Sequence, residues 1–125
     1  MVGDDYTHVK EFFTGADEHY DHPDVKLYEK TDSLVVISTL NHNPFEAIFL
    51  FENDTCFFQR LSVYCSPCAD VVVDGIVKDE DYNFEVVDPV NYISTRDGNI
   101  VMRLKEKIDK QGNCNEITIY KIKEN

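Results

Sequence analysis

Apolar residues alternate with polar ones through most of the chain after residue 33, and short turn sequences interrupt the alternation repeatedly. A period of two places the apolar side chains on one face of a β-strand. The clearest case is segment 100–108, and the Asp97-Gly98 pair before it is typical of a hairpin turn. The pattern therefore predicts a chain built mainly from antiparallel strands with short connections.

One further segment, Asp5 to Ala16, has apolar residues at helical spacing. Thr7 is the expected N-cap of this helix, and Gly15 marks its expected end. About eight strands are expected after it, at Leu34 to Leu40, Phe45 to Phe51, Cys56 to Cys65, Val71 to Val77, Tyr82 to Val87, Tyr92 to Thr95, Ile100 to Ile108 and Glu116 to Lys123. With 125 residues, the chain fits a single domain, 1–125. We predict a mainly β fold, an antiparallel meander that forms a small barrel with a short N-terminal helix, and a sandwich is the alternative.

The chain contains four cysteines, Cys56, Cys65, Cys68 and Cys114. An even number in a small domain predicts two disulfides, and four cysteines allow three pairings. We expect Cys65 and Cys68 each to pair with a distant partner, Cys56 or Cys114. In the chain-entropy model, a long loop closed by Cys114 would stabilise the fold by roughly 3–4 kcal/mol.

Asn53-Asp54-Thr55 is a glycosylation sequon at a predicted hairpin turn, so we expect a glycan on Asn53. The first residues have neither the basic start nor the apolar core of a signal peptide, which predicts a mature, processed chain. Together with paired cysteines, the sequon predicts a secreted, extracellular protein.

Cys65-Ser66-Pro67-Cys68 also has the spacing of redox and zinc sites. Thioredoxin-like redox sites need a helix directly after the motif, whereas Ala69 to Val73 predicts a strand and Asp70 disfavours a thiolate. A zinc site would need Cys56 and Cys114 to complete four thiolates, and Cys114 has no second cysteine beside it. An intracellular zinc or redox protein is therefore kept as an alternative.

No sequence motif indicates catalysis: the chain has no Gly-rich phosphate loop, no Gly-x-Ser-x-Gly and no His-Glu-x-x-His. Segment 17–24 contains His19 and His22 among several carboxylates, but without a rigid scaffold it is interpreted as a solvated linker. We predict that the protein is not an enzyme and uses no cofactor and no metal.

The formal net charge of −12 limits the choice of partners. A phosphate backbone or an anionic membrane surface would be repelled, so neither nucleic acid nor membrane is expected. No apolar run approaches the roughly 20 residues of a membrane span. Basic protein surfaces and cationic small molecules remain as partners, because acidic charge would speed their arrival.

Several predicted strands are apolar on both faces, such as Phe45 to Phe51 with Ile48 and Leu50 opposite the phenylalanines. A barrel wall in water should be polar outside, so something must cover the outer face: the N-terminal helix, a dimer mate or a target protein. The expected contact residues are an acidic loop and two tyrosines that we take as exposed: Asp79, Glu80, Asp81, Tyr82 and Tyr92.

A short N-terminal helix, about eight antiparallel strands, acidic charge, a sequon and the late Cys114 resemble a small lipocalin, most of all the divergent salivary lipocalins of ticks. The resemblance spans most of the chain and lies in the architecture, since the lipocalin Gly-x-Trp signature is missing. It implies scavenging of host amines or lipids, or blockade of host defence proteins such as complement components.

The sequence thus predicts a secreted, barrel-type binding protein that captures a host defence protein and so serves immune evasion. The alternative is a carrier of a small amine or lipid, in which acids inside an aromatic pocket would hold a cation by charge and cation–π contact.

Overall fold

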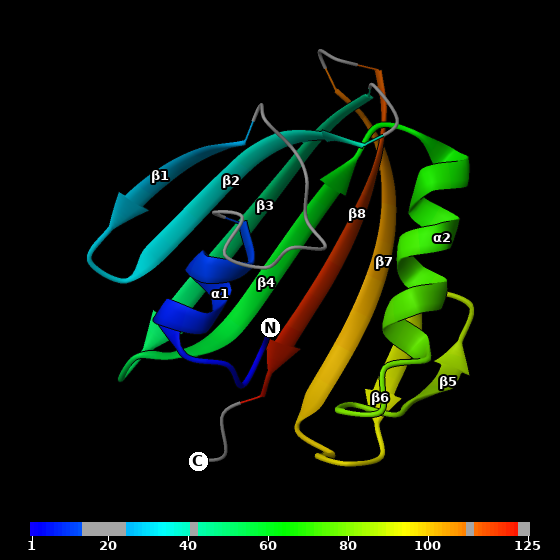
Figure 1. Ribbon diagram of the computed structural model, residues 1–125. Helices are drawn as coiled ribbons and strands as arrows, with labels where there is room; N and C mark the ends of the chain where they lie inside the picture. Colours follow the sequence, from blue (N-terminus) through cyan, green and yellow to red (C-terminus); the bar gives the residue numbers. More distant parts are fainter. Residues whose placement is uncertain (14–24, 41–42, 110–111, 123–125) are drawn as a thin grey trace.

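The computed structural model describes residues 1–13, 25–40, 43–109 and 112–122 of the chain. These residues form eight strands and two helices (Figure 1). In chain order they are α1 (Tyr6–Phe13), β1 (Lys26–Lys30), β2 (Ser33–Leu40), β3 (Asn43–Glu52), β4 (Thr55–Val63), α2 (Ser66–Val77), β5 (Phe84–Asp88), β6 (Asn91–Ser94), β7 (Ile100–Asp109) and β8 (Gly112–Lys121). The mainly β, antiparallel fold with an N-terminal helix is confirmed.

All eight strands belong to one antiparallel sheet in the order β1-β2-β3-β4-β8-β7-β6-β5. The chain leaves β4 through α2, starts again at the far edge with β5, and returns until β8 pairs with β4. Two four-strand meanders are therefore joined at their inner strands, and their outer strands β1 and β5 lie at opposite edges (Figure 1). The expected barrel is wrong because the described strands do not close, and the sandwich is wrong because they form one sheet.

Both described helices pack against the same face of the sheet, which we call the inner face (Figure 1). Side chains that pair across the strands form its central row, namely Leu34, Phe49, Gln59, Ile119 and Met102. Val9 and Phe13 of α1 and Cys68 and Ala69 of α2 belong to the same buried cluster as the apolar members of this row. The outer face, defined by the alternate strand positions, carries neither of these helices.

Helix α1 is fixed at its start by Asp5, whose Oδ1 accepts a hydrogen bond of 2.8 Å from the His8 backbone N–H. Asp5 therefore occupies the N-cap position, and the expected cap at Thr7 is wrong. Two side chains also attach the helix to β1. The Tyr6 hydroxyl donates to the Glu29 carboxylate, and Lys10 Nζ lies 2.9 Å from the same carboxylate. The expected helix end at Gly15 and Ala16 lies outside the described residues.

Residues Val71 to Val77, expected as a strand, belong instead to helix α2. The buried and half-buried positions are Cys68, Ala69, Val72, Val73, Ile76 and Val77, a spacing that matches 3.6 residues per turn. The exposed positions between them are Asp70, Val71, Asp74 and Gly75. Three consecutive valines favour a strand locally, but burial of one helical stripe against the sheet outweighs that preference.

Two predicted hairpins are confirmed. Asn53 and Asp54 adopt φ values of 52° and 66° between β3 and β4, as a tight two-residue hairpin turn requires. Asp97 supports the turn between β6 and β7, where its Oδ1 accepts from the Asn99 N–H at 3.0 Å. Strand β1 was not predicted, because three of its five residues are charged and its partner strand supplies the register.

The two faces of the sheet predict unequal costs for the same substitution. Leu34→Ala on the inner face, where Leu34 is 0% exposed, should lower the free energy of unfolding by about 2–5 kcal/mol. Leu50→Ala on the outer face, where Leu50 is only partly buried, should cost less than about 2 kcal/mol. Urea unfolding of both variants measures the difference, and equal losses would contradict the assignment of the faces.

Candidate functional sites: the outer face and the Cys65–Cys68 turn

An apolar row crosses the outer face of the sheet. Strand register pairs Leu50 with Phe58, Phe58 with Tyr120, Tyr120 with Val101 and Val101 with Ile93. All five side chains are half-buried, and they come from five adjacent strands, β3, β4, β8, β7 and β6. We call them the outer apolar row. The two-sided apolarity seen in the sequence thus becomes one continuous band across the sheet.

Charged side chains border this row on one side. The Arg60 guanidinium lies 5.3 Å from the centre of the Phe58 ring, and its Nε lies 3.9 Å from Glu116 Oε2. Lys107 Nζ lies 3.2 Å from the same carboxylate oxygen. A band of apolar side chains beside paired charges has the anatomy of a protein interface, an apolar centre with a polar rim.

The acidic loop after α2 belongs to none of the five strands that carry this row. Asp79 is half-buried and its Oδ1 accepts from the Asp81 N–H at 2.9 Å, whereas Glu80 and Asp81 are exposed. Tyr82 is buried, with 6% of its surface exposed, and its hydroxyl donates to the Val2 carbonyl oxygen at 2.7 Å. Burial raises the Tyr82 pKa, and the nearby carboxylates add to the effect. The expectation that Tyr82 is exposed is therefore wrong.

Tyr92 lies on β6 and Asn53 lies in the turn between β3 and β4. Tyr92 pairs with Met102 on the inner face and packs half-buried against the core. Asn53 is exposed at the tip of the β3–β4 turn, where a glycan would project from the sheet end, and its glycosylation stays a prediction. The structure therefore does not gather the five expected contact residues into one surface.

The cysteines are arranged differently from the expected framework. Cys65 and Cys68 form a disulfide with each other, with their Cα atoms 5.1 Å apart. Cys56 and Cys114 are buried and are not disulfide-bonded. Cys56 lies near the start of β4, while Cys114 adjoins Asn115, the partner of Val63 at the other end. Seven strand residues separate the two positions by about 20 Å, far beyond disulfide reach.

The expected long-range pairing is thus wrong, and the stabilisation expected from the disulfide is smaller. A loop of four residues gives only about 2 kcal/mol in the chain-entropy model, less than half of the value for a loop of about 100 residues. The four sulfurs are not gathered as the zinc alternative requires, and the described residues contain no group of three or more metal-binding side chains. Segment 17–24, with His19 and His22, lies outside the described residues.

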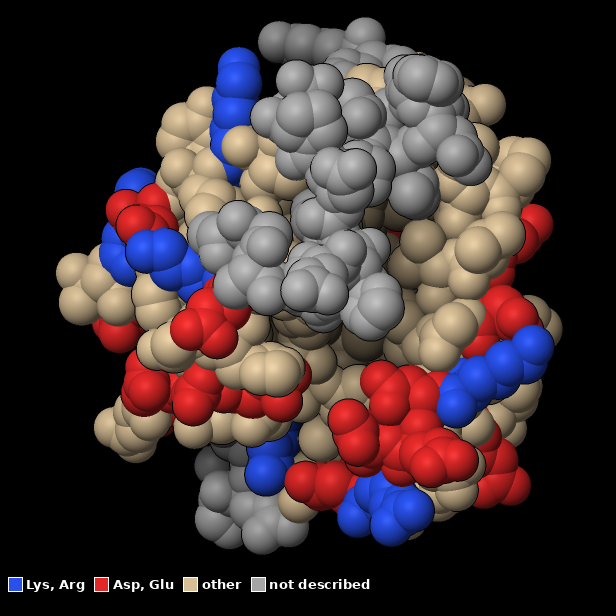
Figure 2. Space-filling model, viewed as in Figure 1, with Lys and Arg blue, Asp and Glu red and all other residues tan. Residues whose placement is uncertain are grey.

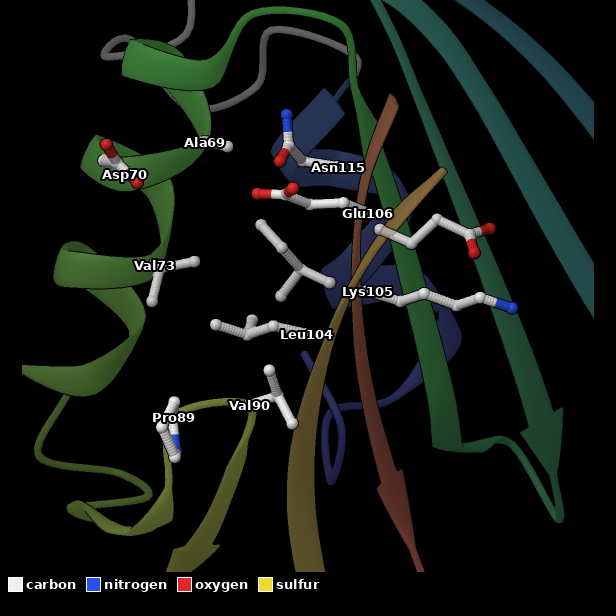
Figure 3. Close-up of a pocket in the computed structure, with 11 residues that line it drawn as sticks. Ala69, Asp70, Val73, Pro89, Val90, Leu104, Lys105, Glu106 and Asn115 are labelled. Carbon is white, nitrogen blue, oxygen red and sulfur yellow. The ribbon is translucent and has the colours of Figure 1, made fainter. Parts of the chain in front are cut away.

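A groove runs between α2 and strands β7 and β8 (Figure 3). It has a volume of about 430 Å³, and Val73 and Leu104 point toward each other across it (Figure 3). Its lining is aliphatic with carboxylates, and it contains none of the aromatic residues that an amine pocket was expected to use. A second hollow of about 250 Å³ shares Glu106 and Asn115 with it and reaches Ser66 and Cys114.

Acidic side chains outnumber basic ones on the face of the molecule shown in Figure 2. This is the side on which both helices lie (Figure 1). The basic residues of β7, by contrast, include Arg103, Lys105 and Lys107, which alternate onto the outer face. None of the helices in the described residues is long and apolar enough to cross a membrane.

Sequence reasoning missed the outer apolar row as a site, although it found the signal for it. The two-sided apolarity of β3 and β8 was visible in the chain. Which residues share one transverse row depends on register between strands far apart in sequence, such as Phe58 and Tyr120. A single sequence does not give that register.

Thiol labelling tests the cysteine arrangement. In native protein purified without reductant, an alkylating reagent should leave all four sulfurs unmodified, because two are in the disulfide and two are buried. After unfolding without reductant, only Cys56 and Cys114 should be labelled. Peptide mass spectrometry reads both results, and a bond from Cys65 or Cys68 to either of the others would contradict the structure.

Burial raises the pKa of the Cys56 thiol from 9.0 to about 11. The folded protein therefore keeps this proton at pH values where the unfolded chain has lost it, so stability falls as pH rises from about 9 to about 11. Cys56→Ala should show a smaller fall than the wild-type chain over that range, because this ionisation is then absent, while the buried Tyr82 hydroxyl, whose pKa is also raised, still contributes. Urea unfolding across the range measures it, and identical falls would contradict the effect.

Comparison of the chain with models of known protein families, with curated proteins and with solved structures finds no match. The described strands form an open sheet, so the barrel that was expected beside the resemblance to lipocalins is absent from them. The features of the structure that bear on function are the outer apolar row, the groove and the cysteine turn.

Proposed function

We propose that this chain is a binding protein that holds another protein against the outer face of its sheet. The observation that carries the proposal is the outer apolar row: Leu50, Phe58, Tyr120, Val101 and Ile93. Both described helices lie on the inner face, so a packed core supports the strands that carry the row. A rigid sheet that presents side chains in fixed positions binds with little loss of conformational freedom.

The composition of the row favours a protein partner. Phe58 and Tyr120 are neighbours at its centre, and aromatic side chains are enriched among the residues that contribute most to binding. Arg60 stacks on Phe58 and completes a group of residue types common in interface centres. The paired charges of Glu116 and Lys107 form a rim that would determine the orientation of the partner more than the affinity for it.

The narrower expectations stay predictions. Secretion depended on two disulfides and a sequon, and its remaining support is one disulfide, Cys65–Cys68, and the exposed position of Asn53. A host defence protein as the partner, and immune evasion as the role, follow from the lipocalin resemblance alone. The amine or lipid carrier has less support, because the described groove is open and lined mainly by aliphatic side chains and carboxylates.

Substitution within the row should weaken binding specifically. In a pull-down from serum, the immobilised wild-type chain should retain one protein. The variant Val71→Ser should retain the same protein, and Phe58→Ser should not. Val71 is 71% exposed on α2 and serves as the matched apolar control. With that protein purified, Phe58→Ser should raise Kd about 30-fold, as loss of a residue contributing about 2 kcal/mol requires.

Three results would overturn the proposal. One is that no protein is retained at micromolar concentration. Another is that the retained protein binds Phe58→Ser as well as wild type. The third is that the chain forms a dimer in sedimentation equilibrium that Phe58→Ser abolishes, because a second copy would then occupy the row.

A further inference from the structure

The Cys65–Cys68 disulfide lies at the start of helix α2, a position that the sequence did not predict. Cys65 is the N-cap residue, a proline occupies the first turn, and Cys65 Sγ accepts a hydrogen bond of 3.2 Å from the Cys68 N–H. Unpaired backbone N–H groups give the start of a helix a partial positive charge. A thiolate at this position is stabilised, which is the arrangement that reactive Cys-x-x-Cys pairs use. Of the two reasons for excluding redox chemistry, the absence of a helix no longer holds, and only the carboxylate of Asp70 on α2 remains against it.

The two sulfurs differ in accessibility. Cys65 is half-buried, and Ser66 and Pro67 beside it are exposed. Cys68 is 3% exposed and belongs to the buried core. Cys65 is therefore the more accessible of the two cysteines, and Cys68 is shielded. Such asymmetry sets which sulfur is attacked and which one leaves.

Two hollows lie close to the pair. Ser66 lines the smaller hollow, which shares Glu106 and Asn115 with the larger groove along α2 (Figure 3). Val73 and Leu104 line the larger groove, and the Glu106 carboxylate extends toward α2 (Figure 3). Ile108, 82% exposed, stands at the edge of the smaller hollow. The larger hollow combines apolar and acidic side chains, and the smaller one, nearer the cysteine turn, is lined mainly by polar and charged side chains.

A purely structural role accounts poorly for this disulfide. The bond closes a loop of only four residues, so it restricts the unfolded chain little. The same four residues are already fixed by the helix start and by the Ala69 N–H, which donates to the Cys65 carbonyl at 2.9 Å. Both cysteines belong to the start of α2, so the bond does not link two elements that could otherwise separate.

We propose that the Cys65–Cys68 pair is a thiol–disulfide exchange site that oxidises a dithiol polypeptide held in the groove along α2. One thiolate of the dithiol attacks Cys65 Sγ, the Cys65–Cys68 bond breaks, and Cys68 leaves as a thiolate that takes up a proton. The second thiolate of the dithiol attacks its own sulfur in the mixed disulfide and releases Cys65. The partner loses two electrons and two protons, and the cysteine pair gains them. This activity is separate from binding at the outer apolar row.

The test uses Cys68→Ser, which leaves Cys65 without its partner. Incubated with glutathione disulfide at neutral pH, folded Cys68→Ser should form one glutathione adduct on Cys65. The rate should exceed that of the same chain unfolded in urea by about tenfold, because the helix start stabilises the attacking thiolate. Cys65→Ser, in which the three remaining thiols, Cys56, Cys68 and Cys114, are all buried, is the matched control and should react far more slowly. Circular dichroism confirms that each variant is folded.

The wild-type chain supplies a second measurement that does not depend on a variant. Dithiothreitol should open the Cys65–Cys68 bond while circular dichroism stays unchanged, and glutathione disulfide should restore it. A bond that resists dithiothreitol until the protein unfolds would overturn the proposal. So would a Cys65 adduct that forms no faster than in the unfolded chain.

The groove is tested separately with a short apolar peptide that contains two cysteines. Val90→Glu, which places a charge in the groove lining, should slow oxidation of the peptide several-fold and leave the reaction with dithiothreitol unchanged. Val87→Glu, on an exposed residue outside the lining, is the control. Equal peptide rates in the two variants would overturn the groove as the peptide site.

Discussion

The pairing of β4 with β8 is the contact on which the rest of the structure depends. Six residue pairs, from Phe58–Tyr120 to Val63–Asn115, join two meanders that are otherwise connected through α2. On the inner face the pairing places Leu61 beside Ile117 in the buried core. On the outer face the same pairing sets Phe58 beside Tyr120. Core and candidate binding surface are therefore two sides of one strand pair.

The crossover through α2 follows from that pairing. Because β8 takes the place next to β4, the chain must travel to the far edge before it can form β5, and α2 spans this distance against the inner face. The strand end and the helix start then meet at Cys65, where the two cysteines lie one turn apart. The geometry that makes this cysteine turn a candidate for exchange chemistry is thus a consequence of topology.

Much of the local structure could be predicted from the sequence. Two-residue alternation identified the strands around Leu34, Phe49, Phe58 and Met102, and turn residues identified two hairpins correctly. The errors occurred where local preference and tertiary burial disagree. Three valines suggested a strand in α2, charged residues concealed β1, and the cysteines suggested long-range pairs. Of the candidate sites, the sequence indicated that an apolar outer face exists, but not which residues form it.

The sequence by itself determined the β class, the alternation of faces and the hairpin turns, because these depend on neighbours within a few residues. Tertiary structure alone decided that the sheet stays open, that Tyr82 is buried and that Cys65 pairs with Cys68. Each of these depends on which distant strands meet and in what register. A shift of one residue would turn every side chain of a strand to the other face, and only the packed core fixes that choice.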